Sequence, residues 1–208
     1  MLKKTKSKNF KNYNKMKKDI ILAGVGGQGI LSIAATIGLA AIDAGLFLKQ
    51  AEVHGMSQRG GDVQSHLRLS DKEIASDLIP EGKADMIISV EPMESLRYLP
   101  MLSPEGWVIT NTKPYINITN YPAMKDIMAE LDKVKRHVVI DADQIASDLV
   151  SPKSANMVIL GAASPFLDIE FSKLENAIRS LFRNKGDDVI NKNIEALNIG
   201  RKHAEKTL

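Results

Sequence analysis

The 208-residue sequence contains no cysteine. Disulfide bonds, zinc sites built on thiolates and iron–sulfur clusters ligated by cysteine are therefore excluded within this chain. Aromatic residues are also scarce, at 5% with a single tryptophan. We expect Tyr98 and Trp107 to be packing residues rather than a stacking platform. The remaining composition, 44% hydrophobic and 25% charged, is typical of one soluble globular domain.

Positive charge is concentrated at the N-terminus. Residues 1–18 hold eight lysines and no acid, so residues 19–208 carry 20 basic and 25 acidic side chains, a net charge of −5. A nucleic-acid-binding domain would spread its basic residues over a folded face, so this function is not expected. We predict a flexible Lys-rich arm at residues 1–18, of which 1–15 are a dispensable tail or an upstream extension, and a single domain at 19–208.

Residues 20–42 form a 23-residue run without a charged side chain. This length matches a transmembrane helix, but five of the residues are glycine, and four of those lie within 24–29. So many glycines would weaken a continuous helix. A strand, a glycine turn and a helix explain the run better, so we expect no membrane span and a cytoplasmic protein.

Short apolar runs alternate with helical segments along the domain. Residues 62–69 alternate in polarity, and a turn at 70–72 is expected to lead to a short partner strand. Asp141 is expected to end a strand and cap the next helix, and Ser172 to open a helix by a capping box. The alternation predicts an α/β fold of three layers, α/β/α, with a mainly parallel, mixed sheet. The expected strands are 19–23, 46–53, 62–69, 85–90, 107–110 and 137–141, and the expected helices are 30–44, 92–99, 121–134, 155–163, 172–182 and 188–205.

Residues 24–29, GVGGQG, fit the pattern G-x-G-x-x-G between an expected strand and an expected helix. Glycines allow close backbone approach, and the N–H groups of a helix N-terminus attract an anion. Glu52 follows near the end of the second strand, where a dinucleotide-binding fold places the acid that binds ribose. The motif alone leaves open an NAD or FAD site and a turn that only permits close packing. The candidate binding residues here are Gly24, Gly26, Gly27, Gln28 and Gly29.

A second glycine-rich stretch, AEVHGMSQRGG, occupies residues 51–61. A dinucleotide-binding fold does not need it. GVGGQGI at 24–30 followed by this stretch resembles the small subunit of indolepyruvate:ferredoxin oxidoreductases and, more broadly, the gamma subunits of 2-oxoacid:ferredoxin oxidoreductases. NMVILGA at 156–162 resembles another segment of that family. The resemblance extends over nearly the whole chain from Met16, and it implies the fold of the pyruvate-ferredoxin oxidoreductase gamma domain.

The resemblance implies an enzyme that oxidatively decarboxylates a 2-oxoacid, an aryl pyruvate for the indolepyruvate type, on thiamine diphosphate. The acyl group passes to coenzyme A, and electrons pass through [4Fe–4S] clusters to ferredoxin. This chain lacks cluster cysteines, and Gly186-Asp187-Asp188, its nearest match to the GDG start of a thiamine-diphosphate motif, lacks the third glycine. We therefore expect a hetero-oligomer in which a large alpha subunit carries both cofactors, and no activity or bound metal for this chain alone.

The resemblance also implies that both glycine stretches face the catalytic subunit near coenzyme A. Arg59, between flexible glycines, could hold a phosphate or carboxylate in bidentate fashion, with a salt bridge as the alternative role. His54 could adjust a polar network, although a lone histidine is more often structural. No catalytic residue is expected. The candidate binding residues of this second stretch are His54, Ser57, Gln58, Arg59, Gly60 and Gly61.

Other motifs are incomplete. Residues 55–59 approach a G-x-S-x-G nucleophile elbow, but Arg59 replaces the last glycine. Residues 141–146 begin like a calcium loop without its glycine. His54 and His66 lack a partner at metal-ligand spacing. The alternatives to the oxidoreductase subunit are a free-standing NAD- or FAD-binding domain and an interaction scaffold.

Overall fold

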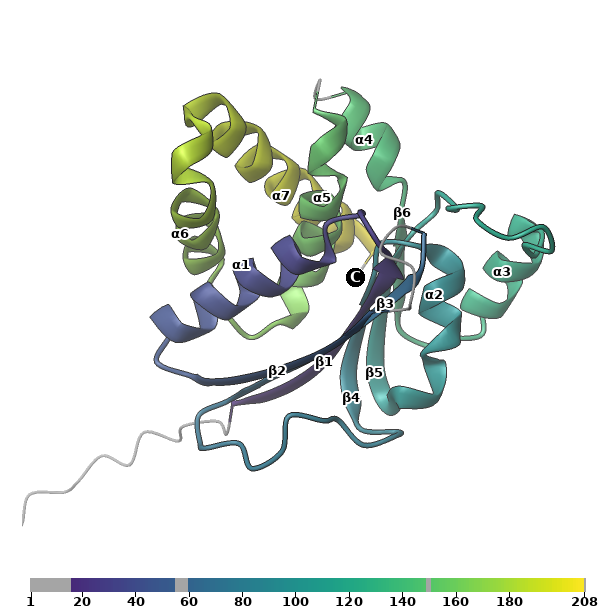
Figure 1. The fold of residues 1–208 in the computed structure, drawn as a ribbon, viewed down its shortest axis with the longest axis horizontal. Helices are drawn as coiled ribbons and strands as arrows, with labels where there is room; N and C mark the ends of the chain where they lie inside the picture. Colours follow the sequence, from purple (N-terminus) through teal and green to yellow (C-terminus); the bar gives the residue numbers. More distant parts are fainter. Residues whose placement is uncertain (1–15, 55–59, 149–150, 208) are drawn as a thin grey trace, which may run out of the picture.

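The computed structural model describes residues 16–54, 60–148 and 151–207, and its centre is a six-stranded sheet in the order β2-β3-β1-β4-β5-β6 (Figure 1). Strands β1, β4, β5 and β6 pair in parallel, whereas β3 runs antiparallel to both β1 and β2. The predicted mainly parallel, mixed sheet is confirmed. The strands are β1 Lys17–Val25, β2 Phe47–His54, β3 Asp62–Ser70, β4 Ala84–Ser89, β5 Leu102–Asn111 and β6 His137–Ile140.

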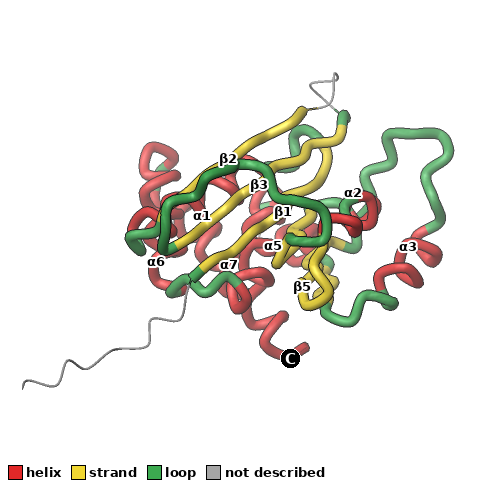
Figure 2. Tube along the Cα trace, turned by 90° about the horizontal axis from the view of Figure 1, so that it is seen from below, coloured by secondary structure: helices red, strands yellow, loops and turns green. Residues whose placement is uncertain are grey.

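Helices cover both faces of the sheet, as Figures 1 and 2 show. On one face lie α1 Ile30–Asp43, α5 Ala155–Ala163, α6 Phe171–Phe182 and α7 Asp187–Thr207. On the other lie α2 Pro92–Arg97 and α3 Met124–Leu131, while α4 Ala142–Asp148 follows β6. Within the described residues, no helix is long and apolar enough to cross a membrane.

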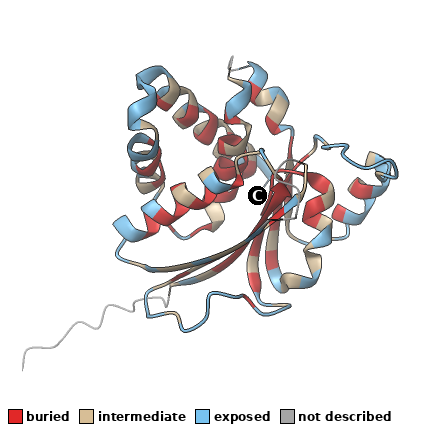
Figure 3. Cartoon of the chain, in the orientation of Figure 1, coloured by how far each residue is buried: buried red, intermediate tan, exposed pale blue. Residues whose placement is uncertain are grey.

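The core is divided by the sheet into two clusters, because side chains alternate between its faces. In β1, Ile20 and Leu22 pack under α1 and α5, whereas Ile21 belongs to the smaller cluster with Ile127 and Leu131 of α3. Figure 3 shows the buried residues following the sheet and the inward sides of the helices. The two clusters confirm the three layers.

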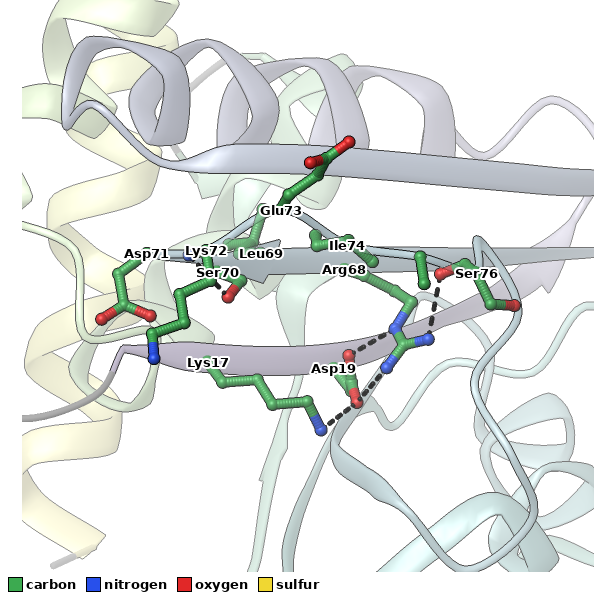
Figure 4. A pocket seen from close by; sticks show the side chains of 11 residues that line it. Lys17, Asp19, Arg68, Leu69, Ser70, Asp71, Lys72, Glu73, Ile74 and Ser76 are labelled. Carbon is green, nitrogen blue, oxygen red and sulfur yellow. Dashed lines mark hydrogen bonds and ion pairs between the residues drawn. The ribbon is translucent and has the colours of Figure 1, made fainter.

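The predicted partner strand after residues 70–72 is wrong. Residues 71–83 contain no strand and run across the face of β1 and β3 that the helices leave open (Figure 2). Side chains of the sheet bind their carbonyls instead: Arg68 donates to the oxygens of Ser76 and Leu78, at 3.0 and 2.9 Å. Figure 4 shows Arg68 also paired with Asp19, beside a cavity of about 400 Å³.

The predicted helix boundaries were partly wrong. The helix expected from residue 121 begins only at Met124, after Pro122. The expected capping box at Ser172 is not formed, because α6 begins at Phe171 with Glu170 at the N-cap position. Asp141 does cap α4, since its Oδ1 accepts a hydrogen bond from the Gln144 N–H at 3.0 Å. Strand β1 begins at Lys17, so the end of the predicted arm belongs to the sheet, while residues 1–15 lie outside the described residues.

Candidate functional site

The glycine loop connects the end of β1 to the N-terminus of α1, as the sequence predicted. Gly27 and Gly29 have φ angles of 99° and 82°, which favour glycine. Gly24 is needed for packing, because a Cβ there would lie 2.4 Å from the Val90 side chain. The Gln28 side chain folds back, and its Oε1 accepts a hydrogen bond from the Val25 N–H at 2.8 Å. The turn therefore contains one internal side-chain hydrogen bond.

The N-terminus of α1 points into the candidate site. Gly29 is its N-cap residue; no described side chain caps the helix, and its first turn holds no acidic residue. The partial positive charge of the helix dipole is therefore not neutralised locally. Such a terminus favours binding of an anion.

A crevice of about 720 Å³ opens in front of this terminus. The glycine loop, the ends of β4 and β5 and the N-terminal ends of α4 and α5 line it. Strand β1 leads to α1 on one face of the sheet, whereas β4 leads to α2 on the other, and open α/β folds bind ligands where neighbouring strands diverge in this way. Two exposed cations, Lys153 and Lys185, lie at its wall. The crevice can therefore accept an anionic ligand.

Asn156 joins the crevice to the glycine loop. Its Nδ2 donates to the Gly29 carbonyl at 3.1 Å, and a Cβ on Gly29 would lie 2.5 Å from that nitrogen. Its Oδ1 is buried and accepts no hydrogen bond from any described residue. An acceptor without a donor in this position would suit a ligand N–H or O–H group.

The two glycine stretches meet in the structure. The Gly26 N–H donates to the Gly61 carbonyl at 2.9 Å, and Gly60 has a φ of 77°. His54 is the last residue of β2, but its side chain lies outside the described residues, as do Ser57, Gln58 and Arg59. The binding roles of these four residues stay predictions.

The acid expected to bind ribose in a dinucleotide site lies on a strand that is not next to β1. Glu52 lies on β2, and β3 separates β2 from β1. In the dinucleotide-binding fold, the strand that carries the ribose-binding acid lies next to the first strand. Glu52 instead accepts a hydrogen bond from the neighbouring Gln50 Nε2 at 3.3 Å. The strand order therefore disfavours the NAD or FAD alternative.

Polar side chains also gather beside Gly61, on the α2 side. The Tyr98 hydroxyl donates to Asp62 at 3.3 Å, and burial together with the Asp62 charge raises the pKa of Tyr98 to about 12. Burial raises the pKa of Glu94 too, although its ion pair with Arg97 at 2.7 Å opposes this shift. Tyr98 therefore stays protonated, and it remains a hydrogen-bond donor at neutral pH.

Sequence reasoning missed several residues of the crevice. Asn111 lies at the end of β5, and its Nδ2 donates to Asp143 of α4 at 2.7 Å. Lys153 and Asn156 come from a segment more than 120 residues after the glycine loop. Position was a signal for Asn111, which directly follows a predicted strand whose carboxyl end faces the same edge as the glycine loop. For Asn156 the signal was the NMVILGA segment, which begins at this residue.

Comparison with known proteins identifies the family. The sequence profile of the pyruvate ferredoxin/flavodoxin oxidoreductase family matches residues 19–203. This chain belongs to that family. It is similar to the indolepyruvate oxidoreductase subunit IorB of Archaeoglobus fulgidus, at 37% identity over 91% of this chain and 96% of that protein, and to that of Pyrococcus horikoshii, at 35% over 96% and 99%. Relatives named for pyruvate, ketoisovalerate or 2-oxoglutarate are 26–28% identical.

The fold agrees with this assignment. The solved pyruvate oxidoreductase subunit of Thermotoga maritima superposes with a TM-score of 0.71 at 20% identity, covering 90% of this chain and 96% of that chain. The predicted family, the gamma-subunit fold and the assignment as an oxidoreductase subunit are confirmed.

Proposed function

We propose that this family member is the small subunit of an indolepyruvate-type 2-oxoacid:ferredoxin oxidoreductase. The enzyme would oxidatively decarboxylate aryl pyruvates in the cytoplasm, transfer the acyl group to coenzyme A and pass the electrons to ferredoxin. The observation that carries the proposal is the difference in identity: relatives named for indolepyruvate share 35–37% with this chain, against 26–28% for those named for other 2-oxoacids.

In this proposal a large alpha subunit holds thiamine diphosphate and the [4Fe–4S] clusters. The chain has no cysteine to ligate a cluster. In the part of the chain that the structure describes, no three histidine or acidic side chains come together as a metal site. The small subunit would then complete a site whose cofactors belong to its partner.

The lining of the crevice supports the proposal that coenzyme A binds there. The uncapped N-terminus of α1 and the cations Lys153 and Lys185 favour an anion, and the buried Oδ1 of Asn156 can accept a hydrogen bond from a ligand N–H or O–H. When bound, coenzyme A would supply the thiol that receives the acyl group. The residues of this chain would hold and orient it.

Exposed apolar side chains support a hetero-oligomer. On α1, this chain alone leaves Leu31 and Ile42 exposed at 54% and 59%. Ile116, in the segment between β5 and α3, is exposed at 71%. Apolar surface of this kind is typical of sites where another protein binds.

The proposal is tested by co-expressing the chain with a large subunit that contains a thiamine-diphosphate motif and cluster cysteines. The purified complex should reduce ferredoxin only when coenzyme A is present, with a higher kcat/KM for indolepyruvate than for pyruvate or 2-oxoglutarate. A preference for pyruvate or 2-oxoglutarate would contradict the indolepyruvate assignment.

The alternative is a free-standing dinucleotide-binding domain. It predicts that NAD, NADP or FAD stabilises the isolated chain, by about 2.7 kcal/mol at 100 times the Kd. We expect no shift of the melting temperature with any of the three.

A further inference from the structure

A carboxylate with no exposed surface lies just beyond the end of β4. Glu91 is 0% exposed, and its Oε2 accepts a hydrogen bond from the Glu94 N–H at 2.8 Å, which caps α2. Its Oε1 accepts two more, from the Tyr115 N–H at 3.2 Å and from the Tyr121 hydroxyl. One side chain therefore holds both the start of a helix and the segment 112–123 between β5 and α3.

The burial of Glu91 is compatible with its charge because three donors surround it. A buried carboxylate is costly unless it is hydrogen-bonded. Burial and the bond to Glu91 both raise the pKa of Tyr121, so its hydroxyl remains a donor at neutral pH. Capping of α2 uses only one carboxylate oxygen, and the other is devoted to the 112–123 segment.

The 112–123 segment in turn contacts the second glycine stretch. Asn117 Nδ2 donates to the Gly60 carbonyl at 2.5 Å. The next carbonyl, that of Gly61, accepts the hydrogen bond from the Gly26 N–H at 2.9 Å. A continuous series of contacts therefore runs from Glu91 through Asn117 to the glycine loop at the crevice.

We propose that Glu91 is a positioning residue for this site. It fixes the 112–123 segment, which holds the Gly60–Gly61 backbone against Gly26 and so sets the shape of the glycine loop that faces the ligand. The inference rests on the proposed function in one respect, which is that the crevice receives coenzyme A. The positioning itself can be measured on the free subunit.

The first experiment measures amide hydrogen exchange in the isolated chain by NMR. Glu91→Gln keeps the shape of the side chain but cannot accept from all three donors, and Tyr121→Phe removes one donor and leaves the cap of α2 intact. Asp141→Ala, which removes the cap of α4, is the matched control. We expect exchange of the Tyr115 and Gly26 amides to rise about tenfold in the first two variants and to stay unchanged in the control.

A change confined to the Glu94 amide in Glu91→Gln, with Gly26 unchanged in both variants, would show that Glu91 only caps α2 and would overturn the proposal. If Glu91→Gln does not fold, Tyr121→Phe alone decides.

The second experiment uses the assembled enzyme. Glu91→Gln and Tyr121→Phe should raise the KM for coenzyme A about tenfold, with kcat changed by less than about twofold, because positioning for binding is lost and chemistry on the partner is not. Wild-type KM values in both variants of an active complex would refute the role of Glu91. A wild-type complex without turnover dependent on coenzyme A would instead refute the proposed function, and the exchange experiment would still judge the positioning.

Discussion

His66 connects a segment without secondary structure to the sheet. Its Nδ1 accepts a hydrogen bond from the Ile79 N–H at 3.0 Å, which requires that this nitrogen be unprotonated. Burial lowers the pKa of His66 below its ordinary value of 6.5, and Arg68 lowers it further, while Asp77 opposes the shift. Protonation would therefore break a bond that holds residues 71–83.

The pKa shift of His66 predicts an acid-sensitive stability. Between pH 6.5 and the lower folded pKa, the unfolded chain binds more protons than the folded chain. Stability should therefore be fully present above pH 6.5 and fall as the pH decreases toward the folded pKa. In His66→Gln the amide oxygen can still accept a hydrogen bond from the Ile79 N–H. When the pH is lowered from about 7.5 to 5.5, the urea unfolding midpoint of this variant should therefore fall less than that of the unsubstituted chain. Equal losses in both proteins would exclude His66 as the cause.

Arg59 lies outside the described residues, so its role stays a prediction from the sequence. If it binds coenzyme A or the partner, Arg59→Ala should raise the KM for coenzyme A or weaken assembly, by about 1.5–3 kcal/mol. Lysine should rescue poorly, because it cannot form a bidentate pair. An internal salt bridge would give the opposite pattern, in which the free subunit melts earlier and the assembled enzyme turns over normally.

At the scale of helices, α5 and α7 cross where each carries a glycine. A Cβ on Gly161 would lie 2.0 Å from the Leu197 carbonyl, and one on Gly200 would lie 2.0 Å from the Val158 carbonyl. Both obstacles are backbone atoms, so a side chain could be accommodated only if one helix moved. This crossing gives a packing reason for the glycine in the NMVILGA segment.

The crossing predicts that Gly161→Ala and Gly200→Ala each destabilise the chain by about 1–3 kcal/mol in urea unfolding, because the overpacked helices must shift. Gly38→Ala is the matched control in α1, where the Cβ would meet only the flexible Leu48 side chain at 3.2 Å. There the gain in helix propensity, up to about 1 kcal/mol, should offset the contact. Equal effects at all three positions would contradict the packing explanation.

Elements with local signals were predicted well from the sequence. The apolar run before the glycines gave β1, the helix expected at 30–44 is α1 at Ile30–Asp43, and residues 155–163 form α5. The segment 71–83 was mispredicted because side chains of other strands, including Arg68, bind its carbonyl groups. Phe171 packs against the core and extends α6 past the predicted Ser172 cap, which no local pattern indicates.

Of the candidate site, the sequence predicted only the part formed by residues that are close together in the chain. The glycine loop satisfies a spacing rule, so its place between β1 and α1 could be read directly. The contacts of Asn156 and Asn117 with glycine carbonyls join residues 127 and 57 positions apart. Those pairs depend on the order of the strands, and the sequence did not reveal that β3 lies between β1 and β2.

For the whole molecule, the exposed apolar side chains predict where the partner binds. Ile116→Ser should weaken association with the large subunit about tenfold or more, since burying such a side chain contributes about 1.5–3 kcal/mol. Leu78→Ser is the matched control, because Leu78 is similarly exposed, at 55%, but lies in another part of the molecule. Its carbonyl binds Arg68, which lies beside the start of β1, at the opposite end of that strand from the glycine loop. Co-purification and titration with the large subunit measure the association of both variants. Loss of binding in Leu78→Ser alone would place the interface elsewhere.

The packing of later helices against α1 also has a consequence during synthesis on the ribosome. Helix α1 ends at Asp43, but α5 and α6, which pack against it, span residues 155–182. At a translation rate of about 5–20 residues per second, α5 and α6 are synthesised on the order of ten seconds after α1, and its apolar face stays exposed until then. During that time Ile33 and Ile37, fully buried in the finished protein, are open to chaperones or to other nascent chains. The packing of the first third of the chain is therefore completed only after the last third has been synthesised.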